Sequence, residues 1–452
     1  MELKMTEGRP LTLISRFTLP ILLGFIFQQF YNMVDTVIVG RYIGPGALAA
    51  VGSTGTIMFM IIGIANGLST GYTVLTSQRY GAEDREGTRR AFVNSILLAL
   101  ISTALITGIA IFTMKPLLRL MNTPEDIFAD ASAYIITICA GSLALILYNL
   151  LAASLRAIGN SRTPLYFLIF SAFLNIVLDL VFILGLHLGT MGAALATDVS
   201  QGVSAILCIV YIYRHVEVLR PKKGDWHLDS GSTLNQLNIG IPMALQFGIT
   251  ASGTMVMQAS INIYGSVAVG GFTAASKVIN LMTAGMPSIG QAMAAYAGQN
   301  YGKGDLKRVH EGTKAAMLLA AVYSLVTALL TVALLPVIIR LFFDAQTDLA
   351  AYMPYARIYT YESAIFYLPL TMIFIYRNTM QGCGYGKTAL TLGFMELISR
   401  LICAAVSMRL GSYAVAVAGD AAAWLLTGLF SFGLYLAIRS KWPERLGRGE
   451  IV

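Results

Sequence analysis

Two acidic side chains lie within long apolar stretches of this 452-residue chain, where an ionised group is costly. Asp35 ends the run FQQFYNMVD, and Asp179 lies in LNIVLDL. No basic residue lies near either acid within its apolar segment, so a local ion pair does not explain them. Ionisable groups inside membrane-spanning segments are functional candidates by default.

Neutral oxygen donors accompany the two acids. Asn175 lies four residues before Asp179, which places both on one face of a helix. Thr197 opens a later apolar segment, and Asn149 lies in an earlier one. Carboxylate, amide and hydroxyl oxygens around one cavity can coordinate a hard cation such as sodium, and two acids can share and release a proton. These residues therefore predict a site for Na⁺ or H⁺.

The composition indicates an integral membrane protein. Hydrophobic residues make up 56% of the chain, charged residues only 12%, and the mean hydropathy is +0.69. A soluble domain carries about 25% charged residues. The net charge of +8 comes from short gaps between apolar runs and forms no sustained basic face, so we expect no nucleic-acid partner. The four cysteines lie in apolar runs without metal-ligand spacing, and we expect no cofactor.

Twelve apolar segments are long enough to cross a membrane as helices, which requires about 20 residues each. The predicted fold is all-α, with segments at roughly 13–39, 47–76, 91–114, 131–153, 163–187, 191–213, 237–263, 267–297, 313–342, 353–380, 387–409 and 413–438. Pro20 in the first segment predicts a bend.

The loop charges predict the orientation. With a cytoplasmic N-terminus, 23 of the 31 Lys and Arg residues fall in the inside loops and tails, and six fall outside. We therefore expect a multi-pass protein of the cytoplasmic membrane with both termini inside. The N-terminal residues lack the pattern of a cleaved leader, so the first helix is expected to stay as an anchor. Asp35 and Asp179 then both lie roughly 25–30 Å from the cytoplasmic ends of their segments, whereas Asn149 lies only about 10 Å above its loop.

The two halves of the chain repeat. SQRYGAED at 77–84 matches GQNYGKGD at 298–305, GNSRTPL at 159–165 matches GYGKTAL at 384–390, and Pro20 pairs with Pro242. We predict two six-helix lobes, 1–213 and 237–452, joined by a polar cytoplasmic linker at 214–236. Because each copy has six helices, the lobes are expected to be related by a pseudo-two-fold axis along the membrane normal.

The duplication places the polar set in one lobe only. At the local offsets the second half carries apolar, small or basic residues instead: Asp35 maps to Met257, Asn175 to Arg400, Asp179 to Ala404 and Thr197 to Gly419. An ion site in the N-terminal lobe explains this asymmetry. Asp198, in contrast, keeps its counterpart Asp420, which favours a shared packing role.

The second half has charges of its own. Glu396 and Arg400 are four residues apart with the acid first, which predicts a helix pair. Lys277 and Glu362 either face the substrate or form a structural pair between helices, and the sequence favours neither.

A substrate cavity is predicted beside the acid of the first segment. Gln28 and Tyr31 share a helical stripe with Asp35, so they are expected to line the same cavity. Met257 lies opposite by the repeat, and a methionine wall adapts to varied ligands.

Taken together, the motifs resemble the multidrug and toxic compound extrusion (MATE) transporters. The similar stretches are LPILLGFIFQQFYNMVDTVIVG, LRAIGNSRTPL, LNIVLDL and the second-half FTAASKVINL with GQNYGKGD. The resemblance covers nearly the whole chain and is greatest to the prokaryotic branch with a cation site in the N-lobe. In that branch the matching positions are Asp35, Asn149, Asn175, Asp179 and Thr197. Segment 7 carries no acid, and Glu362 lies near the outer end of segment 10, so a C-lobe ion site is not matched.

The resemblance implies a monomeric antiporter that exports amphipathic, often cationic compounds in exchange for H⁺ or Na⁺. A flippase for lipid-linked saccharide precursors, from the same superfamily, is the alternative. A membrane enzyme would need clustered nucleophiles or metal ligands, and the four histidines are scattered.

Overall fold

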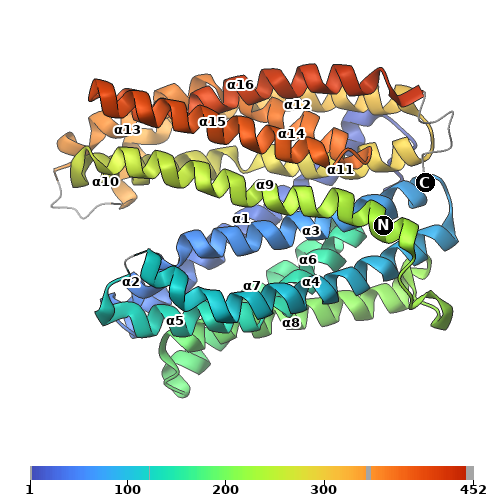
Figure 1. Cartoon of the computed structure of the whole chain (residues 1–452), viewed down its shortest axis with the longest axis horizontal. Coiled ribbons are helices and arrows are strands. Elements are labelled where there is room, and N and C mark those ends of the chain that lie inside the picture. Colours follow the sequence, from blue (N-terminus) through green and yellow to red (C-terminus); the bar gives the residue numbers. More distant parts are fainter. Residues whose placement is uncertain (1–2, 122, 343–347, 444–452) are drawn as a thin grey trace. The chain divides into compact units, whose positions relative to one another are not determined.

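The computed structural model describes residues 3–121, 123–342 and 348–443, and these form helices joined by short loops (Figure 1). The helices of the first half are α1 (Pro10–Tyr42), α2 (Pro45–Ser53), α3 (Gly55–Gly81), α4 (Arg85–Leu120), α5 (Glu125–Ala140), α6 (Ser142–Ala157), α7 (Arg162–Leu180) and α8 (Gly189–His215). Those of the second half are α9 (Ser230–Asn262), α10 (Gly265–Thr283), α11 (Gly285–Gly302), α12 (Leu306–Ile338), α13 (Leu349–Ile365), α14 (Tyr367–Gly382), α15 (Lys387–Leu410) and α16 (Tyr413–Arg439).

The helices confirm the predicted all-α membrane fold. Ten are long and apolar enough to cross a membrane, or up to twelve if each of two bent pairs counts as one span. The bent pairs are α5 with α6 (47°) and α13 with α14 (50°). Large apolar side chains cover the outside of some helices: Phe112 on α4 is 81% exposed. Such a surface suits lipid rather than water. Each of the twelve predicted segments coincides with one helix or one consecutive pair.

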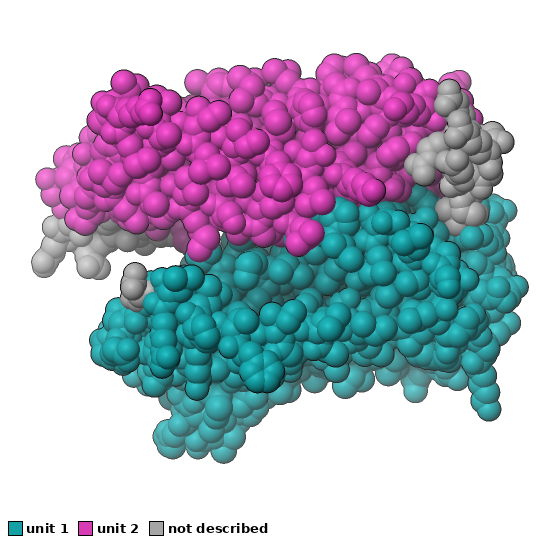
Figure 2. All heavy atoms as spheres, viewed as in Figure 1, with its two compact units in different colours: residues 1–4, 23–244 teal, residues 5–22, 245–452 magenta. Residues whose placement is uncertain are grey.

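The chain packs into two compact units, coloured separately in Figure 2. Unit 1 contains residues 1–4 and 23–244, and unit 2 contains residues 5–22 and 245–452. The division therefore falls inside α1 and inside α9, so the first part of each of these helices belongs to the other half's unit. The predicted lobes assign whole helices and differ in this respect. Residues 230–236, expected in the linker, already form the first turns of α9.

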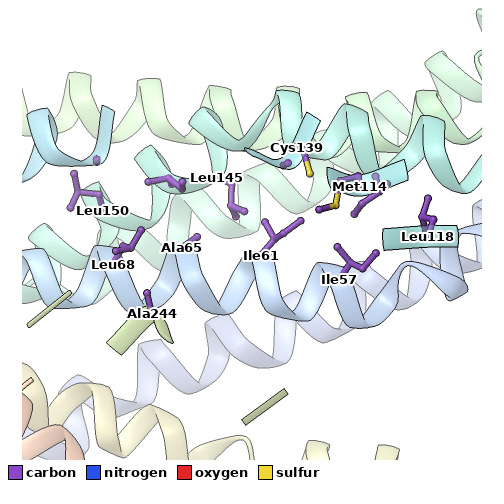
Figure 3. Packing of buried hydrophobic residues seen from close by; sticks show 14 of the residues in the cluster. Ile57, Ile61, Ala65, Leu68, Met114, Leu118, Cys139, Leu145, Leu150 and Ala244 are labelled. Atoms are coloured by element: carbon purple, nitrogen blue, oxygen red, sulfur yellow. The ribbon is translucent and has the colours of Figure 1, made fainter. Parts of the chain in front are cut away.

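Close helix packing explains why the start of α9 joins unit 1. A Cβ atom at Gly67 of α3 would lie 2.6 Å from the backbone N of Ala244, and one at Gly71 would lie 2.7 Å from the backbone N of Gly240. Two glycines spaced by four thus let the α9 backbone rest directly on α3. Ala244 then joins the apolar core formed by α3 to α6, which includes Ile61, Leu68 and Leu145 (Figure 3).

The repeated loop motifs have the same backbone geometry in each unit. Asp84 caps α4 by accepting from Gly87 N (2.8 Å), and Asp305 caps α12 by accepting from Arg308 N (2.9 Å). The residues before these caps, Glu83 and Gly304, both have positive φ. Both loops need an Asp at the N-cap and a residue with positive φ before it, which explains why the loop sequences are similar.

A buried amide network fixes the start of α9 to α4 within unit 1. Asn94 Nδ2 donates to Gln236 Oε1 (2.7 Å), and Gln236 Nε2 donates to the Ala91 carbonyl (2.9 Å) and to Ser95 Oγ (3.0 Å). Asn94 Oδ1 also accepts from the backbone N–H of Asp229 (3.1 Å). Because these amides are buried, their groups depend on one another for hydrogen bonds.

Replacing Gln236 by Ala is expected to lower the free energy of unfolding by about 2–3 kcal/mol, because Asn94 Nδ2 and the Ala91 carbonyl lose buried partners. Thermal unfolding of the purified chain in detergent measures the change. Asn238→Ala on the exposed side of α9 is the matched control and should be nearly neutral. Equal losses in the two variants would contradict the assigned role of the network.

The polar segment between α8 and α9 is held to α4 by an ion pair. Arg89 Nε donates to Asp225 Oδ2 (2.6 Å), and Arg89 Nη2 donates to Asp225 Oδ1 (3.3 Å). Burial alone would raise the pKa of Asp225, but the hydrogen bonds from Arg89 and from the Lys222 backbone N–H outweigh it, so the pKa is lowered. A carboxyl with a lowered pKa stabilises the fold above its unfolded-state pKa, and this contribution disappears as the pH falls through the folded-state value.

Asp225→Asn is therefore expected to lower the Tm at neutral pH. The difference from wild type should be complete above about pH 4, the ordinary pKa of Asp, and should vanish in more acidic solution. Thermal unfolding over a pH series measures this difference. Glu217→Gln, an exposed acid in the same segment, is the control. A difference that persists unchanged into strong acid would argue against the pair.

Candidate functional site

Helices α1 and α7 lie side by side in unit 1 and present the two acids to each other. A Cβ atom at Gly24 would lie 3.4 Å from Leu168 Cδ2, so the Leu168 side chain of α7 packs against the α1 backbone at that level. Eleven residues further along each helix are Asp35 and Asp179. Equal spacing on both helices means that they run in the same direction, as the predicted orientation of these segments requires.

The α-helix of α7 ends immediately after Asp179. Residues Val181–Gly185 form a π-helical turn that directly follows α7. Such turns are rare in proteins and occur frequently at functional sites. Here the wider turn begins two residues after the acid, so it marks the end of the helix that positions Asp179.

The carboxylates of Asp35 and Asp179 lie within hydrogen-bonding reach of each other. Asp179 is fully buried, and neither of its oxygens meets a hydrogen-bond donor among the described residues. Asp35 Oδ1 likewise meets no donor there. Two ionised carboxylates offer only acceptors, so together they cannot satisfy each other. A proton shared between them, or a cation bound by both, removes the conflict.

Asn175 and Thr197 complete this corner of unit 1. Asn175 Nδ2 lies 3.5 Å from Thr197 Oγ1, and Thr197 donates in turn to the Ala193 carbonyl of its own helix (3.2 Å). Asn175 is buried, and its Oδ1 accepts no hydrogen bond from the described part of the chain. The structure thus brings Asn175 and Thr197 together one turn below Asp179, with an amide oxygen still free to bind a ligand.

Two other residues of the first half stand apart from this group. Asn149 Nδ2 donates to the Leu145 carbonyl of its own helix (2.8 Å), and no contact joins Asn149 to the acids among the described residues. The carboxylate of Asp198 lies directly over Gly141, at the break between α5 and α6. A packing role for Asp198 stays a prediction.

Two tyrosines, Tyr31 and Tyr134, lie near the acid pair. Tyr31 forms a hydrogen bond with Gln28 and lies within electrostatic range of Asp35 and Asp179. Tyr134 of α5 lies within the same range of both acids and is buried in the adjoining apolar cluster. Tyr134 is not among the site residues predicted from the sequence. Its only signal was a phenol inside an apolar segment, which is also common in structural cores.

Unit 2 reproduces the corresponding positions with different chemistry. The side chain of Met257 lies under Gly419, with Sδ 3.5 Å from a Cβ placed there, and Met257 is part of the apolar core of unit 2. These are the predicted counterparts of Asp35 and Thr197. The predicted pair of Glu396 with Arg400 is confirmed at 3.3 Å.

Lys277 and Glu362, the other two charged residues singled out in the second half, are not paired with each other. Lys277 on α10 is exposed, and Glu362 on α13 has a buried Oε2 without a donor. No ion pair joins the two among the described residues, which leaves no support for a structural pair. Both stay candidates for the substrate cavity, with Gln28 and Tyr31. Met257, predicted to line that cavity, is instead only 4% exposed and packs in the core of unit 2.

Comparison with known proteins identifies the family. The MatE family profile matches residues 20–181 and again residues 242–406, so a single profile covers each half once. The probable multidrug resistance protein YpnP of Bacillus subtilis is 32% identical over 307 residues, which are 67% of this chain and 68% of that protein. The probable multidrug resistance protein NorM of Thermotoga maritima is 26% identical over 305 residues, 66% of this chain and 64% of that protein.

Solved structures show the same fold at lower identity. A structure described as the outward-facing conformation of a multidrug resistance MATE family transporter has a TM-score of 0.90, 22% identity, and covers 97% of this chain and 98% of that one. A structure described as MATE in the bent conformation has a TM-score of 0.88 and 23% identity, and covers 97% of this chain and 98% of that one.

Proposed function

This chain belongs to the MATE family of transporters, and we propose that it is a secondary active antiporter that exports drug-like compounds in exchange for H⁺ or Na⁺. The exported compounds are amphipathic and often cationic. The protein works as a monomer in the cytoplasmic membrane, with both termini inside. The multidrug resistance relatives support export of drugs, whereas nothing in the site favours the flippase alternative.

The observation that carries the proposal is the acid pair: both oxygens of the buried Asp179 and Oδ1 of Asp35 meet no donor among the described residues. Asp35 and Asp179 face each other from two helices, and Asn175 and Thr197 add neutral oxygens beside them. One bound proton or sodium ion would satisfy the carboxylates. Its release leaves two like charges in an apolar environment, which repel each other and favour separation of the helices.

This repulsion can drive a conformational change because α1 contains Pro20. Proline has no backbone N–H, so the α1 hydrogen-bond ladder is interrupted near Pro20 and the helix bends there at low cost. The boundary between the two units crosses α1 only a few residues later, between Leu22 and Leu23. Loading of the acid pair brings α1 against α7, release lets α1 bend, and the cavity beside Gln28 and Tyr31 changes shape with it. Alternating access follows from this cycle.

Transport assays on the reconstituted chain test the proposal. Proteoliposomes loaded with a fluorescent cationic dye are given an imposed sodium gradient, an imposed pH gradient, or neither. We expect one of the gradients to drive dye movement against its concentration gradient. If neither gradient drives movement while folded protein is present, the antiport proposal fails.

A further inference from the structure

A buried charge network occupies unit 2, where the duplication places the counterpart of the ion site. Arg400 aligns with Asn175, and its Nε donates to Asp420 Oδ1 (2.9 Å) while its Nη1 donates to Glu396 Oε2 (3.3 Å). Tyr359 of α13 donates to the other oxygen of Asp420 (2.9 Å). Arg400, Asp420 and Glu396 are each at most 6% exposed.

Arg377, a charged neighbour of this network, is opposite in sign to Glu396. Arg377 of α14 lies within electrostatic range of Glu396 and stacks on Phe374, with its Cζ 5.1 Å from the ring centroid. On the α9 side Arg400 meets no charge, and a Cβ at Gly253 would lie 3.3 Å from Arg400 Cδ. Two arginines therefore balance two carboxylates, and the network is neutral with Arg400 in place.

Among the described residues, the corresponding part of unit 1 has no cationic side chain paired with its acid. Asp198, the counterpart of Asp420, has no ion-pair partner among the described residues, and Asn175 cannot supply a positive charge. One acid therefore recurs at the same position of the repeat, as Asp198 and Asp420, and within the part of the chain that the structure describes only Asp420 is paired with a cationic side chain.

We propose that the Arg400 guanidinium is a resident cation that fills the duplicated copy of the ion site, so that unit 2 binds no coupling ion and each chain loads ions only at Asp35 and Asp179. The inference rests on the proposed antiport function. A cation tethered to the backbone cannot leave, whereas H⁺ or Na⁺ can. Arg400 thereby limits ion loading to one unit.

The test is whether removing Arg400 creates ion dependence where there was none. Asp35→Asn is introduced first to silence the site in unit 1, and Arg400→Asn is then added, which installs the residue found at position 175. The Tm of each full chain in detergent is measured as sodium replaces choline at constant ionic strength, and again over a pH series. We expect the double variant to gain a Tm rise of roughly 2 °C with sodium or with acid that Asp35→Asn alone lacks. No gain with either would overturn the proposal.

Two further variants keep the result interpretable. Arg400→Lys retains the positive charge and should stay insensitive to ions; sensitivity would contradict the proposal. Arg400→Asn with Asp420→Asn removes the excess charge while the new amide oxygen still accepts from Tyr359, so it should also be insensitive. If Arg400→Asn alone gives no folded protein, the added Asp420→Asn is expected to restore the yield, and failure to restore it would overturn the inference.

These measurements separate the inference from the proposed function. The ion dependence of the wild-type Tm, and its loss in Asp35→Asn, tests the site in unit 1. The Arg400 variants test unit 2 in a background where that first site is absent. A negative result for the Arg400 variants therefore leaves the ion site of unit 1 intact.

Discussion

Asp35→Asn is expected to reduce gradient-driven efflux to the background of empty liposomes while leaving expression and folding intact. The asparagine has the same shape but no charge, and its Nδ2 can donate to the Asp179 carboxylate that lies within reach. The variant therefore imitates the loaded site permanently, and no ion needs to bind or leave. Because the repulsion between two carboxylates is also removed, the Tm should be no lower than in wild type.

Asp179→Asn is the matched variant and should give the same loss, since the carboxylates act as a pair. Ala404→Ser, at the counterpart of Asp179 in unit 2, is the control and should leave coupling unchanged. Wild-type efflux in Asp35→Asn, measured at equal protein in the membrane, would remove the acid pair from the mechanism. A loss of coupling in Ala404→Ser would contradict the placement of the ion site in unit 1.

Much of this architecture could be predicted from the sequence because lipid imposes simple rules. Uninterrupted apolar runs allow few structures except helices, and every predicted segment is helical. The acids could be identified because charge inside such a run is conspicuous. The placement of Asn175 on the same helix face as Asp179 followed from their spacing of four, and so did the pair of Glu396 with Arg400.

Other features depend on contacts between distant residues and could not be predicted. Nothing in the sequence distinguishes Tyr134 from the other tyrosines, because its position near the acids depends on the packing of α5 beside α1. The pairing of Arg400 with Asp420 joins two helices, and no periodicity connects them. The place of the start of α9 in unit 1 likewise depends on the close approach that Gly67 and Gly71 allow, and the sequence does not show which backbone approaches a glycine.

Asn149 illustrates the limit of inference from resemblance. The match placed it in the ion site, whereas the depth estimate placed it near the cytoplasmic end of its segment. In the structure its amide donates to its own helix at Leu145. A role in ion binding for Asn149 therefore stays a prediction, and it would require the amide to give up that hydrogen bond.

Gly71→Ala is expected to be among the most destabilising single-methyl additions in the chain. The new Cβ would lie 2.7 Å from the backbone N of Gly240, and a backbone atom cannot rotate away as a side chain can. Helices α3 and α9 would have to separate, which disturbs the Ala244 contact with the core and the buried amides at Gln236. Overpacking of this kind costs about 3 kcal/mol, which exceeds the gain of about 1 kcal/mol from replacing a helical glycine.

The control for Gly71→Ala is Gly248→Ala in α9, where no described atom outside the local turn of the helix lies within 4 Å of the added Cβ. There the helix-propensity gain should act alone, so the Tm should be unchanged or slightly raised. Thermal unfolding and the yield of monodisperse protein in detergent measure both variants. Equal stability of the two would show that α3 and α9 have room to separate, and the start of α9 would then not depend on this crossing for its place in unit 1.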